Sequence, residues 1–360
     1  MSSERPVVIA GGGTGGHVFP GLAVAEEMRR RLPERPVVWI GAVGGVEERI
    51  VPESGIPLTL LPLAGVARRG LLRGFSAGWL AAAATMRLLV RFARVRPAIT
   101  IGVGGFASGP AVLAALLLGV PTLLLEQNAI PGRTNRALSP FTGAIAVSFA
   151  GSDGLLRGHG VVTGNPVRRS IAAIVPRDRD RLRTLLSFGG SRGAHAINEA
   201  WIGALPRLAD LQLTITVQTG EQDRERVAEA AARAGGDAEV LSFLDDMPER
   251  LAAADLVVAR AGATTVAELT AGGVPSILVP YPFAADDHQR ANARVLADAG
   301  AALVIDPDEL DAGRLAAAVR TLAEAPAQLN RMARAAASLG RPDAAARVAD
   351  LAERLMEGAR

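Results

Sequence analysis

The sequence predicts an α/β fold of two domains, each built on a parallel sheet. Three observations support this prediction. Short apolar runs alternate with helical patterns along the chain, both halves begin with an apolar run that enters a glycine turn, and 360 residues suit two domains. Strands that alternate with helices favour parallel sheets with helices on both faces.

The expected strands are short apolar runs bounded by turn residues. In the first half they are residues 6–10, 37–40, 58–61, 98–101, 122–125 and 144–147. In the second half they are residues 184–188, 212–217, 238–241, 256–259, 276–279 and 302–305. Helical patterns separate most of them, as at residues 21–31, 74–94 and 227–234. The charged stretch 176–181 interrupts the alternation, and we expect it to be the interdomain linker.

The two halves resemble each other where they begin. Residues 9–13 read IAGGG and residues 187–191 read SFGGS, so each expected sheet starts with a strand and a glycine turn. We therefore expect Rossmann-like domains at residues 1–170 and 171–340, with the carboxyl ends of their strands facing one cleft. Residues 341–360 predict a helix with alanine and leucine on one face, which we expect to pack back on the first domain.

Composition excludes several classes of protein. The sequence has no cysteine, so disulfides and thiolate metal sites are impossible. It also has no lysine, which excludes a P-loop nucleotide site; arginine then explains a pI of about 10.5 at a net charge of only +3. No signal peptide or bilayer-spanning run is expected. Aromatic residues are 4% of the chain and no nucleic-acid motif occurs, so nucleic acid is not an expected partner.

Residues 255–292 are the most informative stretch. An apolar strand leads through Gly262 and Ala263 into a helix that carries Glu268. A bare helix N-terminus binds anions, and a carboxylate one turn later can accept hydrogen bonds from a ribose diol. The polar cluster that follows includes Gln289 and Asn292. This pattern favours a nucleotide-sugar site, although an ordinary βαβ unit with a solvated Glu268 fits the same residues.

The first glycine turn, residues 11–17, reads GGGTGGH and contains GxGxxG. Dinucleotide binding would require an acidic residue at the end of the second strand, but the expected strand at residues 37–40 runs into Gly41 and Ala42. The alternative is that the loop lets a diphosphate and a sugar approach the backbone. His17 then opens a helix beside the loop, as a catalytic group or as a structural histidine.

Further polar and glycine-rich loops follow strands of both expected sheets. Residues 102–110 form a second glycine turn, and Glu126 and Asn128 follow the next strand. Arg168 stands near the expected domain junction, and the turn at Ser191 opens the second domain with N–H groups suited to phosphate. Loop chemistry alone can explain each feature, but it does not predict that several of them share one rim.

The stretch around residues 68–94 suggests a membrane surface. Apolar and aromatic side chains alternate there with arginines. Such a pattern suits an anionic bilayer, and it equally suits a core helix with solvated arginines. The expected membrane patch consists of Leu71, Leu72, Phe75 and Trp79.

Several short motifs occur in the order of a known family and cover about residues 7–300: GGGTGGH, GGFASGP, EQN, GNPVR, GGSRGA, FLDDM, RAGATTVAEL and DDHQ. With them the chain resembles the MurG family of bacterial peptidoglycan glycosyltransferases. That family transfers N-acetylglucosamine (GlcNAc) from UDP-GlcNAc to lipid I, undecaprenyl-diphospho-N-acetylmuramoyl-pentapeptide, and so forms lipid II. The resemblance implies a GT-B fold, inversion at the anomeric carbon, no cofactor and no essential metal.

The resemblance also implies roles for individual residues. Ser191 would approach the diphosphate, Leu244 would meet uracil through its backbone, and Glu268 would hold the ribose. The remaining donor-binding candidates are Thr14, Gly15, Gly16, Asn128, Arg168, Ala263, Thr264, Thr265, Val266, Gln289 and Asn292. The acceptor side would include Gly104, Gly105 and Phe106. Phe106 stands where many members carry tyrosine, and Arg192 where glutamine or leucine is frequent.

Three hypotheses remain at this point. The first is the transferase, with His17 as the general base and Glu126 as the second candidate. It implies peripheral attachment to the cytoplasmic face of the bacterial membrane, with lipid I and other cell-wall enzymes as partners. The second is a UDP-GlcNAc 2-epimerase, which needs no acceptor and no lipid-facing patch. The third is a dinucleotide-dependent oxidoreductase, which the missing acidic residue disfavours.

Overall fold

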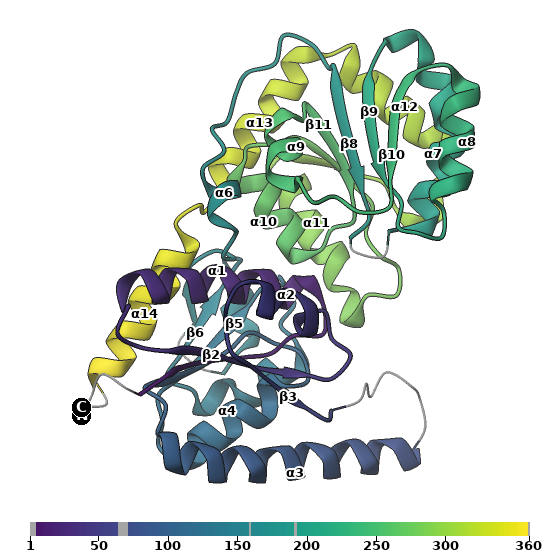
Figure 1. Ribbon diagram of the computed structural model, residues 1–360. Helices are drawn as coiled ribbons and strands as arrows, with labels where there is room; N and C mark the ends of the chain where they lie inside the picture. Colours follow the sequence, from purple (N-terminus) through teal and green to yellow (C-terminus); the bar gives the residue numbers. More distant parts are fainter. Residues whose placement is uncertain (1–4, 64–70, 158–159, 191–192, 359–360) are drawn as a thin grey trace. The chain divides into compact units, whose positions relative to one another are not determined.

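The structure is a computed structural model that describes residues 5–63, 71–157, 160–190 and 193–358 (Figure 1). The chain forms two compact units. The first comprises Met1–Arg168 and Asp343–Arg360, and the second is Arg169–Pro342. Each contains one parallel sheet with helices between its strands, so the prediction of an α/β fold with two Rossmann-like domains is confirmed.

The first domain has a seven-stranded sheet in the order β3-β2-β1-β4-β5-β6-β7. Its strands are β1 Val7–Ala10, β2 Val37–Ala42, β3 Leu58–Leu61, β4 Ile99–Gly102, β5 Thr122–Glu126, β6 Ala144–Val147 and β7 Gly160–Val162. Its helices are α1 Gly15–Arg31, α2 Glu47–Glu53, α3 Leu71–Val95, α4 Ser108–Leu117, α5 Arg133–Leu138 and α14 Ala344–Gly358, with 3-10 turns η1 Ser139–Phe141 and η2 Ser152–Leu155.

Alternation along β1 explains the two layers of this domain. Val7 and Ile9 belong to a core shared with α1, α2 and α14, whereas Val8 and Ala10 belong to a core shared with α3 and α4. Figure 1 shows the long helix α3 running along α4.

The C-terminal helix α14 packs on α1 of the first domain. Val348 and Ala352 are buried in the same core as β1, and Arg31 of α1 contacts Asp350 at 2.6 Å. Apolar burial and an ion pair therefore hold the end of the chain on the domain that begins it.

The second domain has a six-stranded sheet in the order β10-β9-β8-β11-β12-β13. Its strands are β8 Thr184–Phe188, β9 Thr214–Gln218, β10 Asp237–Leu241, β11 Leu256–Ala259, β12 Ser276–Leu278 and β13 Ala302–Val304. Its helices are α6 Arg169–Ala172, α7 His195–Leu208, α8 Arg224–Ala234, α9 Met247–Ala253, α10 Ala263–Ala271, α11 His288–Asp298, α12 Ala312–Ala323 and α13 Pro326–Leu339. The 3-10 turns are η3 Ala209–Leu211, η4 Ala285–Asp287 and η5 Pro307–Glu309. Its main core gathers α7, α8, α12 and α13 against the strands.

The structure corrects the expected linker at residues 176–181. This stretch lies inside the second unit, and the units divide at Arg168 and Pro342. Arg177 contacts the buried Asp255 at 2.6 Å, and the backbone N–H of Arg179 donates to Asn330 Oδ1 at 2.7 Å. The stretch is mostly exposed, but Arg177 and Arg179 are bonded to residues of the second domain, so it is not a connection between the domains. The sequence also failed to predict β7, which has only three residues and a partly exposed edge position.

Candidate active site

In each sheet the strand order brings two loops together near the middle of the sheet, at the carboxyl ends of the strands. In the first sheet β1 lies between β2 and β4, and in the second sheet β8 lies between β9 and β11. The strand order therefore reverses direction between β1 and β4 in the first sheet and between β8 and β11 in the second. In each sheet the loops that follow these two strands lie side by side. Open α/β sheets bind ligands outside the carboxyl ends of strands at this switch point.

The loops after β1 and β4 touch backbone to backbone. The N–H of Gly12 donates to the Gly104 carbonyl at 3.2 Å. A Cβ on Gly11 would lie 2.2 Å from that carbonyl oxygen, and a Cβ on Gly105 would lie 2.2 Å from the Gly12 oxygen. Any larger side chain would separate the loops, so their close approach explains why both are glycine-rich.

His17 lies between these two loops, in the first turn of α1. Its Nδ1 is 3.1 Å from the carbonyl oxygen of Gly12. A carbonyl only accepts, so this contact requires the proton on Nδ1. In the neutral imidazole Nε2 is then the nitrogen that can take up a proton. The ring is half-buried, and it faces Gly104.

Glu126, the second candidate base, is buried at the end of β5. Its Oε1 accepts from the backbone N–H of Asn128 at 3.0 Å, and its Oε2 accepts from Gly132 N at 2.9 Å and from Asn135 Nδ2 at 2.8 Å. These bonds tie the carboxylate to its own loop. The geometry therefore favours His17 over Glu126 as the proton acceptor.

Other candidates of the first domain surround the same switch point. Thr14 is the N-cap of α1 without a side-chain cap bond, and Gly15 and Gly16 form the first turn. The guanidinium of Arg168 lies over the ring of Phe19, 5.0 Å from its centroid. Phe106 is exposed on the loop after β4. The helix start and the arginine would favour an anion here.

In the second domain, α10 begins directly after β11. Gly262 is its N-cap and has no side chain that could cap the helix, whereas the N–H of Val266 already donates to the Gly262 carbonyl at 2.9 Å. The first turn therefore offers the backbone N–H groups of Ala263, Thr264 and Thr265 as the candidate anion donors. Glu268 lies further along α10 and is buried. This is the strand, turn and helix that the sequence predicted at residues 255–271.

Side chains from α11, and Arg260 just after β11, hold the surrounding loops. Asn292 Nδ2 donates to the Ala261 carbonyl at 3.1 Å, and Gln289 Oε1 accepts from Tyr281 N at 2.9 Å. Arg260 donates to Pro280 O at 2.9 Å and stacks near Tyr281. Burial lowers the pKa of Arg260 from its ordinary value. Asn292 and Gln289 thus have supporting roles that the sequence did not indicate.

The glycine loop after β8 packs on the neighbouring loop after β9. A Cβ on Gly193 would lie 1.8 Å from the carbonyl oxygen of Thr219. Ser191 and Arg192 lie outside the described residues. Leu244, the expected uracil contact, is buried between β10 and α9.

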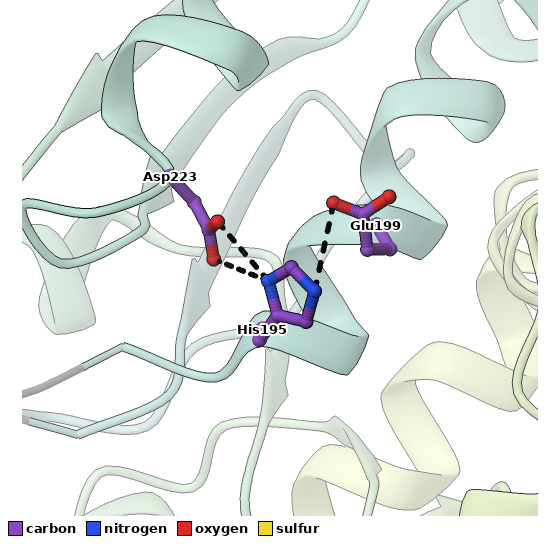
Figure 2. Close-up of side chains that lie close together, drawn as sticks. All are labelled: His195, Glu199 and Asp223. Carbon is purple, nitrogen blue, oxygen red and sulfur yellow. Dashed lines mark hydrogen bonds and ion pairs between the residues drawn. The ribbon is translucent and has the colours of Figure 1, made fainter.

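A polar cluster that the sequence did not reveal stands where α7 begins, next to this loop (Figure 2). His195 Nδ1 lies 3.0 Å from each carboxylate oxygen of Asp223, and its Nε2 lies 4.0 Å from Glu199. Glu199 also pairs with Arg226 at 2.7 Å, and Asp223 accepts from Asn198 Nδ2 at 2.8 Å.

One potential ligand atom from each of these three side chains lies within 4.8 Å of the others, a spacing compatible with a metal site. However, the two ring nitrogens of His195 face different carboxylates, as Figure 2 shows, so one nitrogen cannot join both to one ion. Burial alone would raise the pKa of Asp223, but the hydrogen bonds from Asn198 and His195 outweigh it and hold that pKa below its ordinary value. The cluster is therefore a hydrogen-bonded link between the first turn of α7 and Asp223, the N-cap of α8.

The expected membrane patch is described only in part. The side chains of Leu71, Leu72 and Phe75 lie outside the described part of the chain, whereas Trp79 is 76% exposed. On the same helix Met86 is 62% and Val90 is 50% exposed, while Ala84, Leu88 and Phe92 are buried against α4 and the sheet. The helix α3 therefore has both a core face and an exposed apolar stripe. None of the helices in the described residues is long and apolar enough to cross a bilayer.

Comparison with known proteins agrees with this architecture. The glycosyltransferase family 28 N-terminal domain matches residues 7–147, and the family 28 C-terminal domain matches residues 184–354. A relative from Anaeromyxobacter sp. strain Fw109-5 is 45% identical and covers 97% of this chain and 93% of that protein. It is named UDP-N-acetylglucosamine--N-acetylmuramyl-(pentapeptide) pyrophosphoryl-undecaprenol N-acetylglucosamine transferase.

Two solved structures bear on the fold. MurG from Acinetobacter baumannii is 33% identical with a TM-score of 0.80, covering 97% of this chain and 99% of that one. A UDP-GlcNAc 2-epimerase from Neisseria meningitidis has a TM-score of 0.69 at 13% identity, covering 98% of this chain and 100% of that one, so it shares the fold alone. By the matches to both domains and the identity over nearly its whole length, the chain belongs to glycosyltransferase family 28 and, within it, to the MurG family.

Proposed function

We propose that the chain is an inverting glycosyltransferase that moves GlcNAc from UDP-GlcNAc to the C4 hydroxyl of the N-acetylmuramoyl residue of lipid I. The products are lipid II and UDP. One observation carries the proposal beyond family membership: His17 is fixed between two glycine loops at a switch point, with Nδ1 bonded to Gly12 O. With the proton on Nδ1, Nε2 is the ring nitrogen that would act as the base.

In the proposed reaction, Nε2 of His17 takes the proton from the C4 hydroxyl of the acceptor. The hydroxyl oxygen forms a bond to the anomeric carbon of GlcNAc while the bond from that carbon to the diphosphate oxygen breaks. UDP leaves from the opposite face, so the configuration inverts. The diphosphate gains negative charge in the transition state, and preorganised N–H donors at helix starts would stabilise it.

The second domain, Arg169–Pro342, would bind the donor. The first turn of α10, residues 263–266, would face the diphosphate, and the carboxylate of Glu268 would accept from the ribose hydroxyls. The backbone of Leu244 would meet the uracil, with Ser191, Gln289 and Asn292 around the donor. The donor-binding candidates of the first domain are Thr14, Gly15, Gly16, Asn128 and Arg168.

The first domain would bind the acceptor and the membrane, with Gly104, Gly105 and Phe106 on the acceptor side. Lipid I carries its sugar close to the headgroups, so its enzyme must work at the bilayer surface. The exposed stripe of α3 and its neighbouring arginines would supply that contact. We place the protein at the cytoplasmic face of the membrane, where other cell-wall enzymes are further candidate partners.

The test is to incubate the protein with UDP-GlcNAc, with and without a lipid I analogue. UDP release that requires the acceptor, with lipid II as product, supports the proposal. A 2-epimerised sugar nucleotide formed without acceptor would identify an isomerase on the same fold. An oxidoreductase is disfavoured, since the acidic residue that follows β2, Glu47, is fully buried and its carboxylate accepts from backbone N–H groups rather than facing a ribose site.

A further inference from the structure

Glu47, the first residue of α2, is a carboxylate buried inside the first domain with 0% exposure. Its Oε2 accepts from the backbone N–H of Gly13 at 2.7 Å, and its Oε1 accepts from Ala42 N at 3.0 Å. Among the described residues no cation lies within ion-pair distance of it. Burying a carboxylate is costly unless hydrogen bonds compensate it, so these two bonds fix where the side chain lies.

Glycines enclose this carboxylate on several sides. A Cβ on Gly12 would lie 2.1 Å from Cδ of Glu47, one on Gly45 would lie 2.2 Å from Oε2, and one on Gly41 would lie 2.7 Å from Cγ. Gly12 is in a positive-φ conformation at +152°. Gly12 of the first loop, together with Gly41 and Gly45 of the segment from β2 to α2, therefore makes room for the Glu47 side chain.

The bond from Glu47 acts on the same peptide group as the bond from His17. The carbonyl of Gly12 and the N–H of Gly13 belong to one planar amide, and in a trans amide they point in opposite directions. Glu47 holds the N–H end at 2.7 Å, and Nδ1 of His17 donates to the carbonyl end at 3.1 Å. A rotation of this peptide plane would move both contacts together.

We propose that Glu47 is a positioning residue for His17. By fixing the peptide plane between Gly12 and Gly13, it holds the carbonyl that keeps the His17 proton on Nδ1 and points Nε2 toward the loop after β4. The consequence for turnover rests on the proposed function, whereas the effect on the imidazole does not.

The first test is Glu47→Gln, which keeps the shape of the side chain. An amide has one accepting oxygen, so one of the two backbone N–H groups would face an NH2 donor instead. We expect kcat for transfer to a lipid I analogue to fall about 10- to 100-fold, as for a small misplacement of a catalytic group. The Kd for UDP-GlcNAc should stay within about threefold. His17 is proposed to act on the acceptor hydroxyl in the transition state, so a misplaced ring should lower kcat without weakening donor binding.

The matched control is Glu48→Gln. Glu48 is the next residue of the same helix turn and also accepts a loop N–H, from Gly44 at 2.9 Å, but it is exposed. Its variant should keep the wild-type kcat within about twofold, because a surface substitution of this kind has little effect.

The second readout does not depend on activity. The sequence has only four histidines, so ¹⁵N spectra of the imidazole rings can be assigned by replacing each in turn. In the wild type, His17 should show the tautomer protonated on Nδ1. In Glu47→Gln its ring nitrogens should shift toward a mixture of tautomers, while the other histidines stay unchanged.

A second variant displaces the same carboxylate by changing a neighbouring residue. It keeps the proposal testable if Glu47→Gln does not fold. Gly45→Ala would place a Cβ whose nearest neighbours are all atoms of Glu47, so it displaces the carboxylate without changing its charge. We expect the same loss of kcat and the same change at His17.

The proposal is overturned if folded Glu47→Gln and Gly45→Ala show the wild-type ¹⁵N spectrum of His17 and a kcat equal to that of the control Glu48→Gln. If the His17 spectrum changes but the wild type makes no product from lipid I, the positioning role stands and the proposed function fails. If transfer is normal in the wild type and His17 is unaffected in both variants, only the positioning role fails.

Discussion

The imidazole of His17 lies directly against Gly104, since a Cβ at position 104 would stand 2.7 Å from Cδ2 and 2.9 Å from Nε2 of the ring. Gly104→Ala should therefore push the ring away from its position. We expect kcat to fall roughly 10- to 100-fold with donor affinity little changed. Steady-state turnover on a lipid I analogue and the melting temperature of the variant measure this.

The control for that variant is Gly119→Ala. Gly119 also has a positive φ, +66°, but a Cβ there would meet no described atom within 4 Å. Both variants carry the backbone strain of alanine at positive φ, and only Gly104→Ala disturbs His17. Equal activity of the two would show that the contact with the ring has no part in turnover.

His17 is expected to act as a base, and two substitutions separate that role from a structural one. Glutamine can still donate to the Gly12 carbonyl but cannot take up a proton, whereas alanine can do neither. General-base catalysis contributes about 10²–10⁴-fold, so both variants should lose that much kcat while the donor Kd stays close to wild type. If the kcat of His17→Gln stays within a few fold of wild type, His17 has a structural role and Glu126 becomes the better candidate for the base.

Glu268 is expected to hold the ribose of the donor. Its loss in Glu268→Ala removes a hydrogen bond to a charged group, which costs about 1.5–3 kcal/mol, or about 10- to 150-fold in Kd for UDP-GlcNAc. Calorimetric titration of the folded variant measures this, with Glu225→Ala, an exposed acidic residue in the first turn of α8, as the control. An unchanged donor Kd would remove the ribose assignment.

The hydrogen-bonded link at Asp223 should respond to acid. Because its pKa is lowered in the folded state, its contribution to stability is fully present above the unfolded pKa of about 3.9 and is lost as the pH falls through the folded value. Amide protection at residues 193–198, corrected for intrinsic exchange, should decrease below about pH 4. In Asp223→Asn it should be lower at pH 7 and show no such step.

Global unfolding in acid would also reduce this protection. Amides in the buried part of α12, such as those of Leu315 and Val319, report on it in the same sample. Loss of protection at both places at the same pH would mean that the step belongs to the whole domain and not to Asp223.

The sequence predicted the sheets well, because buried strands of a parallel sheet are short continuous apolar runs. It missed β7, whose residues are partly exposed, and it misplaced the linker, since partners such as Asp255 and Asn330 are distant in sequence from the arginines that they bind. Glycine motifs revealed where His17 lies. They did not reveal Glu47, because nothing in the sequence distinguishes it from its exposed neighbour Glu48 or shows that it is buried under a glycine loop.

The last prediction concerns the exposed stripe of α3. Trp79, Met86 and Val90 share one side of the helix, at spacings of seven and four residues, while Arg87 and Arg94 are exposed beside them. Each arginine near an anionic surface contributes about 1 kcal/mol, and insertion of apolar side chains adds to it. We therefore expect salt-sensitive binding to vesicles that contain anionic lipid.

Replacing Trp79, Met86 and Val90 by serine should reduce co-sedimentation with such vesicles at both low and high salt. Arg87→Ala with Arg94→Ala should reduce it mainly at low salt, because salt screens the contribution of exposed charges. Val175→Ser, an equally exposed apolar residue of the second domain, is the control and should bind as wild type. All three proteins should keep their activity on a short-chain, water-soluble acceptor, since the replaced side chains lie outside the loops around His17. If the triple serine variant sediments as fully as wild type, the membrane contact lies elsewhere on the protein.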